Sequence, residues 1–78
     1  MSNTPHDVYE DFPGQAEKIH ALRASDTHFA HVLDEYHEVN RAVHRAETRV
    51  DVIDEEAETA LRQRRMRLKD QIARALAA

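Results

Sequence analysis

Apolar side chains recur through the middle of the chain at intervals of four, three, three, four, three and four residues. Such intervals return to one face of an α-helix, because a helical turn takes 3.6 residues. This stripe is the strongest periodic signal in the sequence and predicts a long helix over about 27–49. Its members are Phe29, Leu33, Tyr36, Val39, Val43, Ala46 and Val50.

A second apolar seam predicts another long helix, over about 55–76. Asp54 precedes it as an N-cap residue, and Glu55 and Glu56 would lie beside the positive end of the helix dipole. The seam contains Ala57, Leu61, Leu68, Ile72 and Ala75 or Leu76, with Arg65 or Met66 filling the gap in its middle. Two long helices of similar length joined by a short connection favour an antiparallel hairpin.

The N-terminal segment has a different character. Residues 1–12 are polar and lack helical periodicity, so we interpret them as a flexible tail that Tyr9 or Phe12 could pin to the rest of the chain. Pro13 suits the first turn of a helix, where its missing N–H costs no hydrogen bond. We therefore predict a short helix over about 13–24, within a single helical domain that spans 13–78.

Charge supports the hairpin independently of hydropathy. Residues 1–61 contain five Lys or Arg against fourteen Asp or Glu, a net −9, whereas residues 62–78 contain six against one, a net +5. A chain that folds back near residue 51 pairs positions whose numbers add to about 103, and these pairs are opposite in charge. They are Arg49–Asp54, Arg45–Glu58, Glu38–Arg65 and Asp34–Lys69. The expected fold is all-α: a coiled-coil-like antiparallel helical hairpin preceded by a short helix.

Composition narrows the function classes. The 78 residues leave too little interior to shield an active site from water, and the absence of Cys excludes disulfides and thiolate-bound metals. No apolar run approaches the ~20 residues of a membrane span, and no secretory signal is evident, so we expect a cytoplasmic protein. Ser2 and Ser25 have no His–Asp partners that the sequence can identify, and no Gly-rich phosphate loop exists. We therefore expect neither catalysis nor a cofactor.

The apolar seam itself is the main candidate for function. Two helices cannot fully bury both stripes, so we expect the chain to form a homodimer or a larger helical bundle, or to dock on an unidentified protein. The hypothesis is a non-catalytic helical interaction module. Its predicted interaction residues are Phe29, Leu33, Tyr36, Val39, Val43, Leu61, Leu68, Ile72 and Leu76.

A cluster of basic residues supports an alternative of another class, a nucleic-acid-associated regulator that uses the stretch 62–74. Its cations could displace counterions from phosphates. The candidate phosphate contacts are Arg62, Arg64, Arg65, Arg67 and Lys69. The facing acidic segment 34–38 could instead neutralise these side chains, and no aromatic residue lies beside them to stack on bases.

Histidines suggest a third alternative, a metal-binding or pH-responsive protein. His28, His31, Asp34 and His37 recur at i, i+3 spacing on a helix and are of residue types that bind metals. The predicted second long helix has no His, so a metal site would need ligands from a second copy or from the short helix with His20. A solvated, pH-sensitive set of surface histidines is the competing interpretation.

Three short motifs resemble the YdcH family of small bacterial proteins of unknown function. They are His28-Phe29 followed by Leu33, Asp34 and Glu35; the step His44-Arg45-x-Glu47; and Leu68-Lys-Asp-x-Ile72. The resemblance covers roughly residues 15–76 and implies a helical hairpin in the bacterial cytoplasm, with no established activity. Ala46 stands where the family usually has a larger apolar residue, and the family does not require the segment before residue 13.

Overall fold

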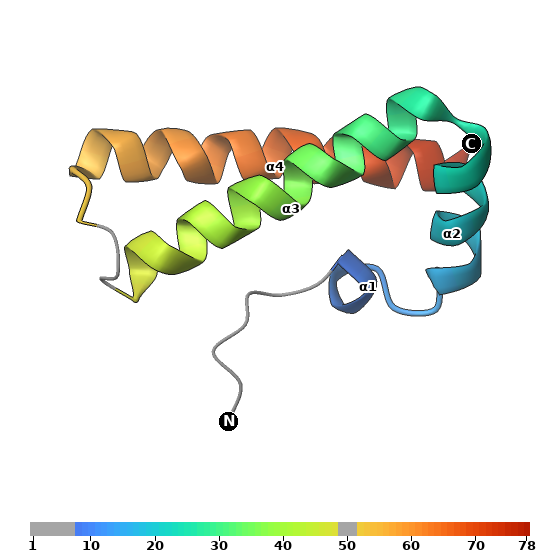
Figure 1. The fold of residues 1–78 in the computed structure, drawn as a ribbon, viewed down its shortest axis with the longest axis horizontal. Coiled ribbons are helices and arrows are strands. Elements are labelled where there is room, and N and C mark those ends of the chain that lie inside the picture. The colour runs from blue at the N-terminus through green and yellow to red at the C-terminus, as the bar shows by residue number, and fades with distance from the viewer. Residues whose placement is uncertain (1–7, 49–51) are drawn as a thin grey trace.

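A computed structural model describes residues 8–48 and 52–78, and every regular element within them is a helix (Figure 1). The helices are α1 (Val8–Asp11), α2 (Ala16–Ser25), α3 (Thr27–Glu47) and α4 (Glu55–Ala77). The helices α3 and α4 run antiparallel and pack against each other, while α2 and α1 both contact α3. The expected all-α hairpin with a short N-terminal helix is confirmed.

Two aspartates set where the long helices begin. The side chain of Asp26 accepts a hydrogen bond from the backbone N–H of Phe29 at 3.1 Å, and Asp54 accepts one from Ala57 at 2.8 Å. Each carboxylate satisfies a backbone donor that the first helical turn leaves without a partner. The N-cap predicted at Asp54 is therefore confirmed.

The end of α3 comes slightly earlier than the periodicity predicts. This helix ends at Glu47, and the hydroxyl of Thr48 turns back to donate to the carbonyl of His44 at 2.9 Å. The predicted stripe residue Val50 and the predicted pair partner Arg49 lie outside the described residues. The helix α4 spans Glu55–Ala77, one residue beyond the predicted end.

A single apolar cluster draws on all four helices. Val8 from α1 and Ile19 from α2 are 1% and 0% exposed, and both pack on the stripe of α3. The cluster consists of Val8, Ile19, Phe29, Val32, Leu33, Tyr36, Val39, Val43, Leu68, Ile72 and Leu76. We expected two helices to leave this seam partly open, but α1 and α2 close it within one chain.

The segment predicted as a flexible tail contains ordered structure. Residues 8–11 form α1, and Tyr9 and Phe12 pack partly against the apolar cluster. The tail interpretation is wrong for this stretch, because burial of Val8 fixes a helix too short to show any periodicity. Residues 1–7 lie outside the described part of the chain.

The short helix α2 begins three residues later than predicted. It starts at Ala16 because Gly14 adopts a left-handed backbone with φ of 81°, which cannot continue a right-handed helix. The chain thus turns between α1 and α2 at Pro13 and Gly14. Lys18 in α2 then donates to the backbone carbonyl of Leu76 and ties α2 to the last turn of α4.

Within residues 8–48 and 52–78, no helix combines the length and the apolar character that crossing a membrane requires.

Candidate functional site

An open groove of about 440 Å³ lies where α1, α3 and α4 meet, and we call it the basic groove. Three of its lining residues are cationic and one is a carboxylate. Its lining consists of Asp11, Tyr36, Asn40, Arg62, Arg65, Met66 and Lys69. Three helices thus contribute to a single surface that contains much of the predicted basic cluster.

The floor of the groove is a partly buried hydrogen-bonded network. The hydroxyl of Tyr36 donates to Oδ2 of Asp11 at 2.5 Å, and the side chain of Asn40 also bonds to Tyr36. Burial, together with the carboxylate of Asp11, raises the pKa of Tyr36 to about 12. Asn40 is only 5% exposed, so its amide lies inside the chain. The network joins α1 to α3 and keeps the tyrosine proton in place at neutral pH.

The rim of the groove is supplied by α4. Arg62, Arg65 and Lys69 recur at helical spacing, so they follow the same side of α4. Within the described residues, neither Arg65 nor Lys69 has an ion-pair partner. Between them the apolar side chain of Met66 is 65% exposed. The rim therefore combines an accessible apolar centre with uncompensated positive charge.

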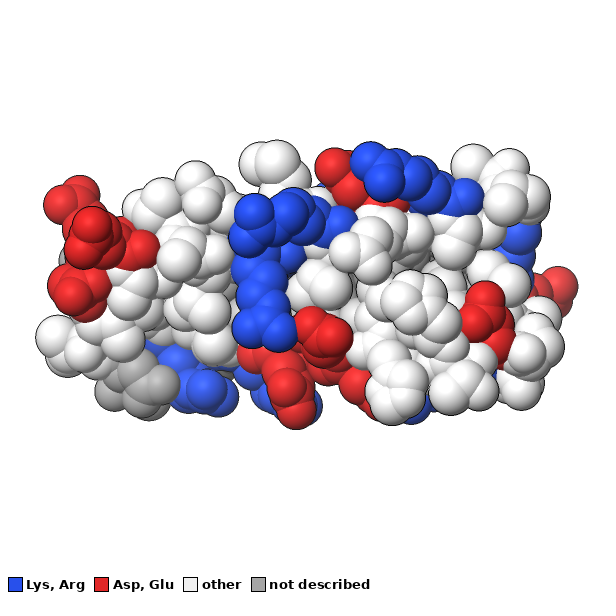
Figure 2. Space-filling view, turned by 90° about the horizontal axis from the view of Figure 1, so that it is seen from above, with Lys and Arg blue, Asp and Glu red and all other residues white. Residues whose placement is uncertain are grey.

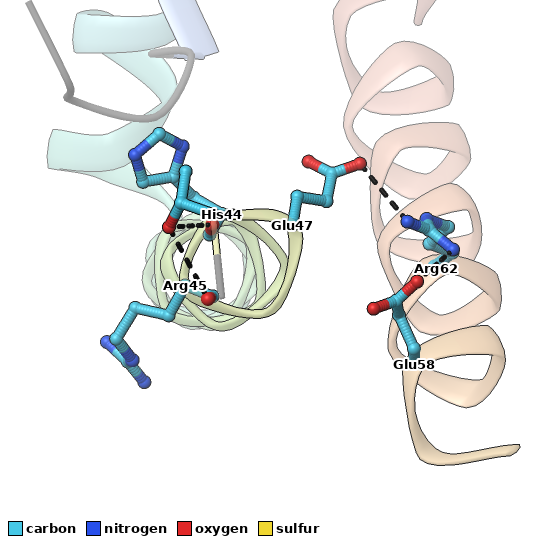
Figure 3. A network of polar contacts seen from close by, with 6 residues as sticks. His44, Arg45, Glu47, Glu58 and Arg62 are labelled. Carbon is cyan, nitrogen blue, oxygen red and sulfur yellow. Dashed lines mark hydrogen bonds and ion pairs between the residues drawn. The ribbon is translucent and has the colours of Figure 1, made fainter. Parts of the chain in front are cut away.

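One end of the groove is fixed by Arg62. Its guanidinium contacts Oε2 of Glu47 at 3.2 Å and Oε2 of Glu58 at 2.8 Å (Figure 3). The hydrogen bond to Glu47 and the charge of Glu58 raise the pKa of Arg62. The predicted pair Arg45–Glu58 is wrong, because Arg45 points away from α4 and Glu58 binds Arg62 (Figure 3). Arg62 thus connects the end of α3 to the first turns of α4.

The remaining predicted basic residues lie outside the groove. Arg64 contacts Glu35 of α3 at 2.8 Å, and Arg67 is exposed on another flank of α4. The predicted pair Asp34–Lys69 is also wrong, because Asp34 contacts Arg23 of α2 at 3.0 Å. Lys and Arg side chains gather over the middle of α4, and acidic side chains gather over its N-terminal end (Figure 2). The predicted phosphate-binding set is therefore divided: Arg62, Arg65 and Lys69 line the groove, whereas Arg64 and Arg67 lie outside it.

The predicted seam residues all belong to the interior or its edge. Leu61 is partly buried, and the other eight are no more than 5% exposed. Their apolar surface is used by the core of the single chain. The folded chain therefore leaves little of this seam on its surface.

The candidate metal residues are not brought together. His28 and His31 are exposed and His37 is half-buried, and no three His, Asp or Glu side chains in the described residues form a group that could hold a metal ion. His20 instead stacks on the ring of Tyr9 at 5.3 Å between centroids and lies 3.2 Å from its hydroxyl. That contact holds α1 against α2.

Three groove residues, Asp11, Asn40 and Met66, were not among the site residues predicted from the sequence. Asp11 fell in the segment interpreted as a tail, and no periodic signal could place it beside Tyr36. Met66 was one of two alternatives for the gap in the α4 seam, and the structure places Arg65 there, half-buried, with Met66 exposed. A helical wheel centred on Leu68 and Ile72 would have put Met66 on the outer side.

Comparison with known proteins identifies a family whose function is unknown. A family model described as "Protein of unknown function (DUF465)" matches residues 29–76. The matched region contains nearly all of α3 and α4 and six of the seven groove residues, and it leaves out α1 and α2. No curated protein and no solved structure matches the chain.

Proposed function

Because this chain belongs to the DUF465 family, which includes the YdcH-type proteins and has no assigned function, we propose its role from its own surface. The role is that of a non-catalytic helical module that binds another protein through the basic groove. The observation that carries this proposal is Met66, 65% exposed between Arg65 and Lys69, neither of which has an ion-pair partner in the described residues.

The composition of the groove favours a protein ligand with acidic side chains around an apolar one. Methionine adapts its unbranched side chain to different apolar partners, so it is common at recognition surfaces. The flanking cations would pair with carboxylates and orient the ligand. A helix that presents one apolar residue between acidic ones fits both features, as in helix-in-groove recognition.

The floor of the groove supports binding over catalysis. The pKa of Tyr36 is raised to about 12 by burial and by Asp11, which keeps its hydroxyl protonated. This hydroxyl donates a hydrogen bond to Asp11, so the pair holds α1 in place. A general base would need a pKa near the working pH.

The side chains that line the groove favour a protein ligand over a nucleic acid. Its single aromatic side chain, Tyr36, is 1% exposed and cannot stack on a base. Arg62 is already engaged by two carboxylates, which reduces the charge available to phosphates. Cations alone would give salt-sensitive contacts without selectivity.

Titration of a fluorescent peptide tests this proposal. The peptide is helical and carries one Leu flanked by Glu residues, and its anisotropy is followed with the full chain. We expect saturable binding that weakens about tenfold or more in Met66→Ser and in Arg65→Glu/Lys69→Glu, because these changes remove the apolar contact or reverse the charge.

Arg74→Glu is the control for charge reversal, because it reverses one positive charge on the same helix at an exposed position that does not line the groove. We expect its affinity to stay within about twofold of the original. Equal affinities for all variants would place binding outside the groove. Preference for a single-stranded RNA of matched charge over the peptide would overturn the proposal in favour of a nucleic-acid ligand.

A further inference from the structure

The charges of α4 are arranged so that the helix complements a reversed copy of itself. Its first turn contains Glu55, Glu56 and Glu58, and its middle contains Arg65, Arg67 and Lys69. We propose that a second copy of this chain packs on α4, with the two α4 helices antiparallel across their exposed faces and Glu55 of each copy on Lys69 at the rim of the other copy's basic groove. This inference rests on the proposed function and names its partner.

A two-fold axis near residue 62 brings the acidic start of each α4 onto the basic middle of the other. In this register, paired residues have numbers that add to about 123, so Glu56 meets Arg67 and Glu55 meets Lys69. With a two-fold axis perpendicular to both helices, each flank of one α4 lies beside the same flank of the other α4. Helical geometry places Glu56 and Arg67 on one flank and Glu55 and Lys69 on the other, so both pairs form on the correct sides.

The exposed face of α4 also has the shape for this contact. A shallow hollow of about 420 Å³ lies on its acidic half, lined by Glu55, Glu56, Thr59, Ala60 and Gln63. The small side chains of Thr59 and Ala60 leave space there for a long side chain of the second copy. In the proposed register that side chain is Arg67, which would enter between the two carboxylates. Figure 2 shows the same separation of acidic and basic groups along this face.

Nothing in the described hairpin competes strongly for these residues. Glu55, Glu56, Arg67 and Lys69 are exposed, and none has an ion-pair partner within the described part of the chain. Arg62, which would lie closest to its own copy at the axis, is neutralised by Glu47 and Glu58 of its own chain. The expected dimer depends on charge and weakens with salt, because the Debye length falls from about 10 Å at 0.1 M to about 3 Å at 1 M.

Reciprocal charge exchange tests the register. Glu55→Lys/Glu56→Lys reverses the acidic half, and Arg67→Glu/Lys69→Glu reverses the basic half. Sedimentation equilibrium at low salt should show the original chain approaching twice 9.0 kDa as concentration rises, with each variant alone at 9.0 kDa. An equimolar mixture of the two variants should dimerise again, because every pair across the axis then has opposite charges.

Dimerisation of either variant alone at the original strength, or failure of the mixture to associate, would overturn the proposal. Circular dichroism establishes that each variant is helical; should a reversal unfold the chain, Glu56→Gln and Arg67→Gln replace it and should each weaken the dimer. A chain that stays monomeric but binds the acidic peptide refutes the self-partner and keeps the proposed function. Absence of both dimer and peptide binding refutes the two together.

Discussion

The two long helices have similar lengths but very different relations to the core. Of the 21 residues of α3, eight are buried, and they extend from its first turn to its last. Of the 23 residues of α4, three are buried, and all lie at Leu68 or beyond. The comparison shows that α3 is the structural centre, whereas the first half of α4 is held in place mainly by its cap and by ion pairs.

This difference explains where a binding surface can exist. Every other element packs on α3, so its apolar face is covered by the chain itself. The first half of α4 touches the core through Leu61, which is partly buried, and leaves its other sides exposed. An interaction module needs such a helix, whose surface can change without loss of the fold.

The largest expected effect is the difference in stability lost when a leucine is truncated in α3 and when one is truncated in α4. Leu33→Ala removes a side chain that is 1% exposed at the centre of α3, and should lower the free energy of unfolding by about 2–5 kcal/mol. Leu61→Ala in α4 removes a partly buried side chain and should cost less than about 2 kcal/mol. Urea denaturation followed by circular dichroism measures both, and equal losses would contradict the contrast.

A smaller effect is expected where α3 meets α1. Tyr36→Phe removes the donor to Asp11 and should cost about 1–3 kcal/mol, because a half-buried carboxylate then loses a hydrogen bond. Tyr9→Phe is the control, since it deletes the same atom from an exposed contact with His20. We expect that change to stay within about 0.5 kcal/mol. The same denaturation experiment compares them, and a larger loss for Tyr9→Phe would show that the groove floor is unimportant.

Tyr36 also makes the free energy of unfolding fall at high pH. Its pKa is about 12 in the folded chain and about 10 when unfolded, so the unfolded state loses its proton first. The stabilisation is complete below pH 10 and is lost as pH rises to 12. Unfolding free energies of the original chain and Tyr36→Phe should therefore converge over this range. A constant difference between them would mean that Tyr36 titrates alike in both states.

The smallest expected effect concerns the start of α4. Asp54→Ala removes the side-chain cap on the N–H of Ala57 and should cost about 0.5–2 kcal/mol, chiefly through fraying of the first turn. Asp70→Ala removes an exposed carboxylate from the same helix and serves as the matched control, with little change expected. Amide exchange in the first turn of α4 locates the loss. Uniform faster exchange through α3 as well would show that the two helices are not as independent as their burial indicates.

How far the sequence predicts this molecule depends on the length of each element. The stripe of α3 is long enough for its periodicity to identify both the helix and the buried face, including Phe29 and Val43. The helix α1 has four residues, so its burial through Val8 is decided by tertiary contacts that no local pattern encodes. The groove includes Asp11 from this helix. The sequence therefore predicted its basic residues on α4 but not its contribution from α1.

The ion pairs show a related limit. A fixed sum of residue numbers assumes parallel helix axes, whereas α3 and α4 diverge toward their connection (Figure 1). The contacts formed are Glu35–Arg64 and Glu47–Arg62, which lie on either side of the predicted register. Charge pattern thus predicted the antiparallel direction correctly, while the partners of individual side chains depend on the crossing geometry.

The helices α1 and α2 cover the apolar seam, and they can detach from it without unfolding of the whole chain. Each of these short helices buries one residue fully, Val8 and Ile19, so detaching them breaks far fewer contacts than unfolding the hairpin does. Regions with few buried contacts open at lower free energy than the global transition. Fluctuations that detach α1 and α2 while α3 and α4 stay paired will therefore expose part of the apolar stripe of α3 before the chain as a whole unfolds, so this stripe is a latent surface rather than a permanently closed one.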